Sequence, residues 1–164
     1  LDTSGVDLDA SHTFRAGRAG DFTLAATWSR LIDFKRPLVA GQAPYDGAGN
    51  NRLGALPLWR GTTSLTWRKN DWTSTLSALT IAGYDQRVAT AASNPGLADR
   101  VKPYTQLDLT VGYTGIANTS LTLSVQNLAD KDPPFDPAGG ANGYDITQYN
   151  LRGQVVGVGA QYRF

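Results

Sequence analysis

Hydrophobic and polar residues alternate along seven segments of this chain. They are 4–14, 22–30, 58–68, 72–84, 104–113, 120–127 and 155–164. Alternation at a period of two indicates β-strands with one apolar and one polar face, because successive side chains of a strand point to opposite sides. Each segment is close to the length of about ten residues that a tilted membrane-spanning strand needs. The pattern therefore predicts an all-β protein, with no long helix.

Short and long connectors alternate strictly between these segments. The short ones, 15–21, 69–71 and 115–120, are rich in Gly, Asn and Asp and suit hairpin turns. The long ones lie at about 35–55, 85–103 and 128–149. Bacterial outer-membrane barrels have short periplasmic turns and long outer loops. The alternation predicts an antiparallel up-and-down sheet of about seven strands, with the C-terminus on the short-turn side.

The two faces of the predicted strands differ in composition. The alternate positions that form one face are apolar, such as Leu24, Leu109 and Leu123, and aromatic residues on this face, including Tyr84, gather near the strand ends. The other is mostly Thr, Ser and Gln, with Asp7 and Asp9 among them. Outward apolar faces, aromatic girdles and a polar lumen are typical of a membrane barrel. A soluble antiparallel β-sandwich shows the same alternation, and the loop lengths and aromatic positions favour the barrel.

Composition excludes several other classes of protein. The net charge is +1, with no basic stripe that would indicate nucleic-acid binding. The chain has no Cys and the single His12, so we expect no metal site and no cofactor. No apolar run is long enough for a transmembrane helix. Asp7 and Asp9 have no positioned partner that would make them a catalytic pair, and no enzyme is predicted.

Two motifs near the C-terminus are more specific than the alternation. The first, "SVQNLADKDPPFDP", closes the sixth segment, and the second, "YNLRGQVVGVGAQYRF", contains the seventh. Their characteristic residues are Asn127, Leu128, Asp130, Lys131, Pro133, Pro134 and Phe135, followed by Tyr149, Arg152, Gly153, Tyr162 and Phe164. In these residues the two motifs resemble the C-terminal end of TonB-dependent outer-membrane receptors. The specific motifs cover about the last 40 residues, whereas the strand pattern agrees over the whole chain.

The resemblance implies a receptor larger than this chain. Residues 1–164 would be the C-terminal part of a barrel of about 22 strands in the bacterial outer membrane, and the plug domain would not be present. Such receptors import a scarce solute, such as a siderophore, cobalamin or an oligosaccharide, with energy from the TonB complex. Expected partners are outer-membrane lipid, the rest of the barrel with its plug, the TonB complex through the missing N-terminal part, and the solute. A smaller passive pore is the alternative transporter.

The patterned last strand has a specific meaning within this resemblance. In the family, an alternating strand that ends in an aromatic residue is recognised by the barrel-assembly machinery, and it closes the barrel by pairing with the first strand. The corresponding residues are Val156, Val158, Ala160, Tyr162 and Phe164. We therefore expect these side chains to face outward and Gln161 to face the lumen.

Ligand contacts, where present, are expected from the long loops and the upper lumen. Aromatic rings and guanidinium groups hold planar, anionic or sugar-like solutes. The candidates are Tyr45, Arg52, Arg87, Arg100 and Tyr104. Ordinary loop polarity explains these residues equally well.

Overall fold

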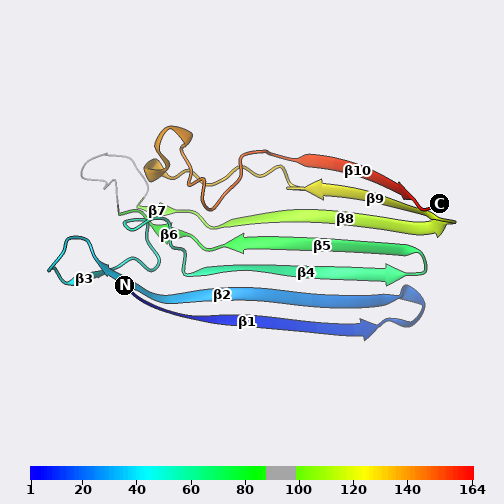
Figure 1. The fold of residues 1–164 in the computed structure, drawn as a ribbon, viewed down its shortest axis with the longest axis horizontal. Helices are drawn as coiled ribbons and strands as arrows, with labels where there is room; N and C mark the ends of the chain where they lie inside the picture. Colours follow the sequence, from blue (N-terminus) through cyan, green and yellow to red (C-terminus); the bar gives the residue numbers. More distant parts are fainter. Residues whose placement is uncertain (88–98) are drawn as a thin grey trace.

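The computed structural model describes residues 1–87 and 99–164, and its main feature is one antiparallel sheet. Its long strands, in spatial and chain order, are β1 (Asp2–Arg15), β2 (Asp21–Pro37), β4 (Trp59–Lys69), β5 (Trp72–Ile81), β8 (Tyr104–Ile116), β9 (Thr119–Gln126) and β10 (Val155–Tyr162). Each pairs with the strand before and after it in the chain, so the sheet is an up-and-down meander (Figure 1). The predicted fold class is confirmed.

The connectors separate by length to opposite ends of the sheet (Figure 1). At the short-turn end lie the 3₁₀ turn η1 (Gly17–Ala19) and two tight turns that contain Asn70 (φ 49°) and Asn118 (φ 57°). Asparagine tolerates this left-handed conformation better than most residues. At the long-loop end lie β3 (Pro44–Asp46), which pairs with β2, the small sheet of β6 (Tyr84–Asp85) and β7 (Arg100–Val101), and η2 (Pro137–Asn142). The C-terminus lies at the short-turn end, as predicted.

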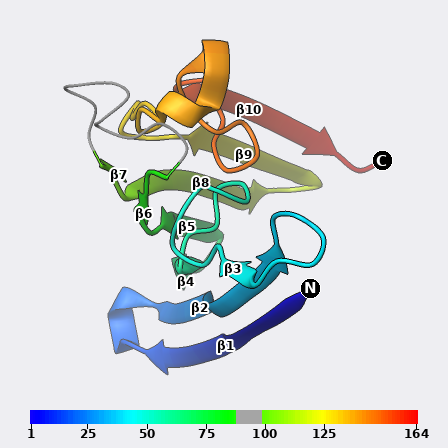
Figure 2. The same ribbon diagram turned by 90° about the vertical axis from the view of Figure 1, so that its left-hand side faces the viewer.

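Strand register places the apolar residues of all seven strands on one face. One row across the sheet is formed by cross-strand partners Leu24, Leu65, Leu76, Leu109, Val125 and Val156. This face is exposed: Val158 is 84% accessible and Leu24 47%. The described residues contain no second large sheet that packs against it, and the sheet forms a single curved wall (Figure 2). The β-sandwich alternative is therefore wrong, because its apolar face would be covered.

The opposite face carries hydrogen-bonded polar side chains. The Thr27 hydroxyl donates to the Asp9 carboxylate at 2.7 Å, and the two residues are cross-strand partners. Paired threonines bridge β1 to β2 and β4 to β5, through Thr13 with Thr23 and Thr66 with Thr75, each at 2.9 Å. Such polar cross-strand pairs stabilise a sheet whose face meets water. The observed arrangement fits a polar lumen.

Trp28 shows how a polar atom is accommodated on the apolar face. Its indole Nε1 donates to the Thr63 hydroxyl at 3.0 Å, which explains a threonine at an outward position. The Trp28 ring covers Gly61, where an added Cβ would collide with the ring. The glycine is therefore required by the tryptophan beside it, and both the indole N–H and the hydroxyl are satisfied away from water.

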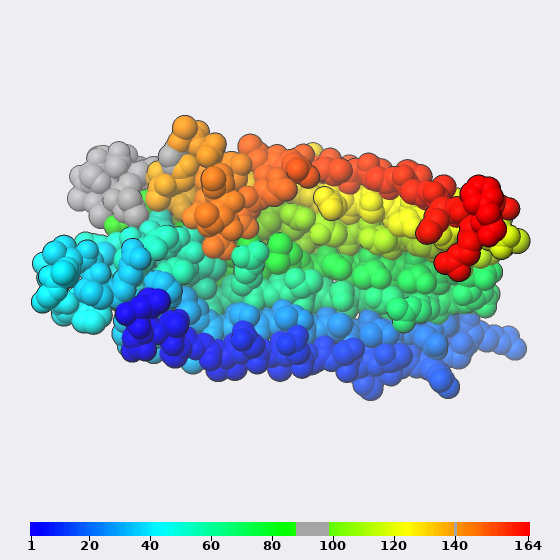
Figure 3. All heavy atoms as spheres, in the orientation of Figure 1, coloured from blue at the N-terminus to red at the C-terminus, as the bar shows by residue number. Residues whose placement is uncertain are grey.

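The buried core lies at the long-loop end and not between layers of sheet. Its apolar members are Ala55, Ile81, Tyr84, Val101, Tyr104 and Tyr149. Loop atoms gather over this end in the space-filling view, in cyan and orange (Figure 3). Among the described residues, no helix has the length and apolar character needed to cross a membrane.

The predicted outward position of Tyr84 is wrong. Strand β5 ends at Ile81, three residues earlier than the alternation suggested, and Tyr84 belongs to β6. Its side chain is fully buried among the long loops. The apolar and polar alternation continues in the sequence past the end of β5, where the chain leaves the sheet and alternate positions no longer define its two faces.

Candidate functional site: the long-loop cluster

Asp136 joins three long loops through a buried carboxylate. Its side chain is 1% exposed. One oxygen accepts a hydrogen bond from the Tyr84 hydroxyl at 2.7 Å, and the other accepts from the Asn51 amide at 3.2 Å and from the backbone N–H of Ala138 at 2.8 Å. A buried carboxylate is tolerated when hydrogen bonds satisfy it. We call Asp136, Tyr84 and Asn51 the loop junction.

Backbone contacts extend the loop junction on its Asn51 side. The Asn51 side-chain oxygen accepts from the backbone N–H of Arg87 at 2.8 Å, and the Asn51 N–H donates to the Asp85 carbonyl. The Asp85 N–H in turn donates to the Gly49 carbonyl at 2.7 Å. These bonds tie the β2–β4 loop to the start of the β5–β8 loop, so the two loops form one structural unit.

A layer of aromatic rings lies beside the loop junction. Tyr104 and Tyr149 meet edge to face, with ring centroids 5.3 Å apart, and pack with Ile81. Burial raises the pKa of Tyr149 to about 12, and burial together with the bond to Asp136 raises the pKa of Tyr84. Both phenols are therefore protonated at neutral pH, and the Tyr84 hydroxyl can donate to Asp136.

The resemblance motif forms a turn that follows β9. Asn127 has a φ of 50° and is 3% exposed. Its amide oxygen accepts from the Lys131 N–H at 2.9 Å, while its amide nitrogen donates to the Lys131 carbonyl at 3.1 Å. The Asn127 N–H donates to the Asp108 carboxylate on β8 at 2.8 Å. One asparagine thus closes the turn and attaches it to the neighbouring strand.

The second half of the motif returns to the same turn. Asp130 accepts from the backbone N–H of Gln154 at 2.8 Å, just before β10. A Cβ at Gly153, where φ is 66°, would lie 3.1 Å from that Asp130 carboxylate, which explains the glycine. Lys131 lies over the Tyr104 ring, with its ammonium nitrogen 5.2 Å from the centroid. The motif therefore positions β8, β9 and β10 at their long-loop ends.

Other motif residues play smaller parts. The backbone of Leu128 donates to the Leu107 carbonyl and accepts from the Gln154 side chain, whereas its own side chain is exposed. The side chains of Pro133 and Pro134 are half-buried, and Arg152 is exposed. Arg152 makes only a local backbone bond to Asn150 among the described residues.

The five ligand-contact candidates do not form one site. The Arg52 guanidinium lies over the Tyr45 ring, 5.0 Å from its centroid. Arg87 and Arg100 both pair with the Asp85 carboxylate, at 3.1 and 3.0 Å, and remain exposed.

Tyr104 differs from the other candidates because it is buried. It is 3% exposed and donates its hydroxyl to the Lys131 carbonyl at 3.2 Å. Its ring is a structural contact with Tyr149 and not a free loop group. A hollow of about 300 Å³ opens nearby, between the polar face of β5 and β8 and residues 146–150.

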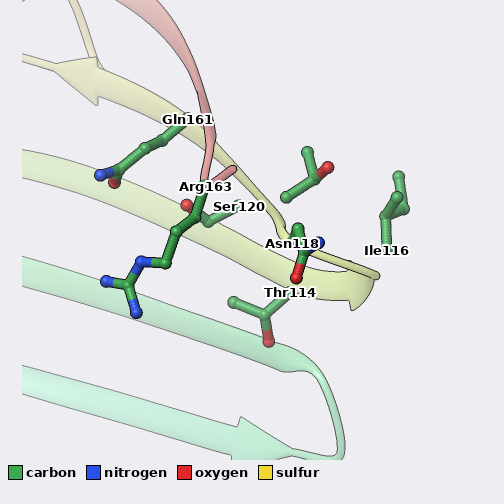
Figure 4. A pocket seen from close by; sticks show the side chains of 7 residues that line it. Thr114, Ile116, Asn118, Ser120, Gln161 and Arg163 are labelled. Atoms are coloured by element: carbon green, nitrogen blue, oxygen red, sulfur yellow. The ribbon is translucent and has the colours of Figure 1, made fainter.

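The polar face also has a hollow at the short-turn end (Figure 4). It measures about 260 Å³. Apart from Ile116, its lining side chains are polar and come from the last three strands and the β8–β9 turn, including Thr114, Asn118, Ser120, Gln161 and Arg163. The register places Gln161 opposite Ser120, on the face away from the apolar row, as predicted.

The closing strand carries the predicted outward side chains. Val156, Val158 and Tyr162 are 58–84% exposed, and Phe164 is fully exposed with its ring edge to face against Tyr162 at 5.1 Å. Ala160 shares this face through its partner Leu121. The outer edge of β10 has no partner strand among the described residues. An unpaired edge of this length is a place where another strand can add.

A protein family matches most of the chain. The family described as "TonB dependent receptor-like, beta-barrel" matches residues 2–128. The chain belongs to this family. It is a family of outer-membrane transport receptors and not of enzymes. The match overlaps the C-terminal motif only at residues 124–128, so the rest of the motif lies outside the residues that the family matches.

Solved receptors share the fold of this receptor barrel segment. The ferric enterobactin receptor of Pseudomonas aeruginosa, in complex with enterobactin, superposes with a TM-score of 0.56 at 16% identity, covering 95% of this chain and 22% of the receptor. The siderophore receptor PiuA of Acinetobacter baumannii gives 0.53 at 16% identity, covering 96% and 21%. The chain thus spans about a fifth of each solved receptor. A search of curated protein sequences finds no match.

The loop junction of this receptor segment is the part that sequence reasoning missed. Asp136 precedes a proline, and Asp-Pro is typical of a turn. The turn is present, with the Ala138 N–H on the Asp136 side chain and the Gly139 N–H on its carbonyl. No local signal indicates the partners, because Tyr84 and Asn51 lie 52 and 85 residues away along the chain.

Proposed function

We propose that this chain is the C-terminal part of the barrel of an outer-membrane receptor that actively imports a scarce solute. The family match over residues 2–128 carries the proposal. The single-layered sheet supports it, because its exposed apolar face suits lipid and its polar face suits a lumen. The plug domain and the segment that contacts TonB would belong to the rest of the receptor.

The long-loop end would face the outside of the cell and capture the solute. Its loops are held together by the loop junction. They carry the exposed guanidinium groups of Arg52, which lies over the Tyr45 ring, and of Arg87 and Arg100, which both pair with Asp85. Such positive groups suit an anionic or catechol-type solute. Rearrangement of the plug, driven from the periplasm by TonB, would then release the solute inward.

A ferric siderophore is the preferred solute class. Both solved receptors are siderophore receptors by description, and one contains enterobactin. Cobalamin and oligosaccharides are the alternatives that the test must separate. The barrel-assembly machinery is the further partner, through Val156, Val158, Ala160, Tyr162 and Phe164.

The test uses the full-length receptor in cells that lack other receptors for the same solutes. Uptake of a labelled ferric siderophore, labelled cobalamin and a labelled oligosaccharide is measured with and without TonB. We expect siderophore uptake that requires TonB. Uptake of another solute that requires TonB would correct the solute class alone. Uptake that continues without TonB would contradict active transport and favour the passive pore.

A further inference from the structure

The apolar face contains a groove near the short-turn end of the sheet. It measures about 300 Å³, and its accessible wall is entirely apolar. It runs across the last four strands, and its lining includes Trp72, Tyr113, Leu121, Leu123, Val158 and Ala160. Trp72 and Tyr113 stand on the β5–β8 side, with ring centroids 4.5 Å apart. Ala160 is the small residue that leaves room on the β10 side.

The groove lies where a membrane interface is expected. Trp72 begins β5 directly after a tight turn, and Tyr113 is its cross-strand partner on β8. Aromatic rings at strand ends mark the level of the lipid headgroups, because one edge of the ring remains wet while its body is apolar. The groove therefore begins at the headgroup level, and its second row of lining residues, Val111, Leu123 and Val158, lies two residues further along the strands toward the hydrocarbon layer.

A cation lies beside the aromatic end of the groove. Lys69 is the cross-strand partner of Trp72 on β4, so both side chains project from the apolar face and start within about 5 Å of each other. Lys69 is exposed, and no ion pair of the described residues involves it. A lysine beyond an aromatic girdle meets the phosphate level of the bilayer, where its charge attracts anionic lipid.

We propose that this face holds one anionic glycerophospholipid at a specific position. An acyl chain occupies the groove between Tyr113 and Ala160, the Trp72–Tyr113 pair contacts the glycerol region, and Lys69 binds the phosphate. The proposal rests on the membrane placement of the family and is independent of the transported solute. The apolar groove and the exposed Lys69 beside its aromatic end together give this position an apolar and a cationic part, which fits an anionic lipid.

The experiment places the full-length receptor in phosphatidylcholine nanodiscs that contain a small fraction of brominated phosphatidylglycerol or brominated phosphatidylcholine. Bromine quenches tryptophan on contact, and subtraction of the Trp72→Phe variant isolates the signal of Trp72. We expect phosphatidylglycerol to be preferred about fivefold, because one lysine near the surface contributes about that factor. Lys69→Gln should abolish the preference, whereas Arg18→Gln, in η1 at the same end of the sheet, should retain it.

A second variant tests the groove itself. Ala160→Phe fills the groove and should reduce quenching of Trp72 by both lipids, whereas Ala26→Phe, on the same face of β2 but outside the groove, should not. The folded fraction of each variant is measured by the mobility of heated and unheated samples. If Ala160→Phe does not fold, the Lys69→Gln and Arg18→Gln pair decides the question. Equal quenching by the two lipids in the unmodified receptor, or an unchanged preference in Lys69→Gln, would overturn the proposal.

Discussion

The sheet exposes its apolar side chains, whereas the long-loop cluster, the buried residues around Tyr84 and Asp136, buries polar ones. On the sheet, apolar side chains are exposed: Val158 on β10 is 84% accessible, and Phe164, just beyond the end of β10, is fully exposed. In the loop cluster, Tyr84 and the charged Asp136 are buried. The first arrangement is stable where lipid replaces water. The second is stable because hydrogen bonds from Tyr84, Asn51 and Ala138 satisfy the buried Asp136 carboxylate. The two regions of the chain are therefore stabilised in two different environments, the sheet in lipid and the loop cluster in water.

The difference predicts that the two regions respond to different substitutions. The cluster should be sensitive to loss of single hydrogen bonds between residues distant in sequence. The sheet should be insensitive to most polar changes on its lumen face and sensitive to charge on its lipid face. The substitutions below test this contrast in the full-length receptor, in order of decreasing expected effect on stability.

The largest effect is expected from Asp136→Ala. The change leaves three donors without their acceptor: the Tyr84 hydroxyl, the Asn51 amide and the Ala138 N–H. An unsatisfied buried donor costs about 1–3 kcal/mol, so the loop junction should lose about 3–5 kcal/mol. Hydrogen exchange of loop amides should increase while that of β4 and β5 amides stays unchanged. Asp33→Ala is the control, since Asp33 forms an exposed pair with Lys35 and its loss should change almost nothing.

Charge on the two faces of β8 should separate the sheet from an ordinary soluble one. Leu109→Arg places a charge on the lipid face and should reduce the free energy of unfolding by about 2–4 kcal/mol near the bilayer centre. Thr110→Arg, one residue further on, faces the lumen and should be tolerated. Leu123→Arg and Thr122→Arg on β9 repeat the comparison, since Leu123 shares the face of the Leu109 row. If the arginine substitutions on the two faces reduce the free energy of unfolding equally in a folding assay, the assigned orientation is contradicted.

These two tests also mark what the sequence could and could not predict. The orientation of the sheet follows from local alternation, and the register agrees with it from Leu24 to Val156. The loop junction depends on contacts across 52 and 85 residues, for which one sequence contains no signal. Tyr84 marks the boundary between the two regions: alternation placed it on the lipid face, although the strand ends before it.

The motif turn is local in the chain, yet it connects three strands, and it should show an intermediate effect. Asn127→Ala removes both amide bonds to Lys131 and leaves, at a φ of 50°, a residue that tolerates the left-handed conformation less well than asparagine. The two lost bonds and the backbone strain together should cost about 2–3 kcal/mol. Asn127→Gly loses the same bonds without the strain and should cost about 1 kcal/mol less. Chemical denaturation of the folded receptor measures both values, and equal losses would show that the left-handed backbone contributes nothing.

The smallest effect on stability, and the most specific effect on assembly, is expected at Phe164. Its contact with a neighbouring ring, that of Tyr162, is worth about 0.5–1.5 kcal/mol, and the rest of its surface is exposed. A purely structural role therefore predicts that Phe164→Ala barely changes the amount of folded receptor. A role as an assembly signal predicts a large fall, because insertion would fail before the final stability matters.

Surface abundance of the full-length receptor decides between these two roles. Phe164→Ala and Tyr162→Ala should both reduce abundance strongly, because both side chains lie on the outward face at the end of β10. Gln161→Ala, which faces the polar hollow of Figure 4, should have little effect. Leu123→Ala on β9 removes apolar area from the same outward face and calibrates the loss that stability alone produces. If Phe164→Ala reduces abundance no more than Leu123→Ala does, the aromatic terminus is not an assembly signal, and it acts only as one more lipid-facing side chain.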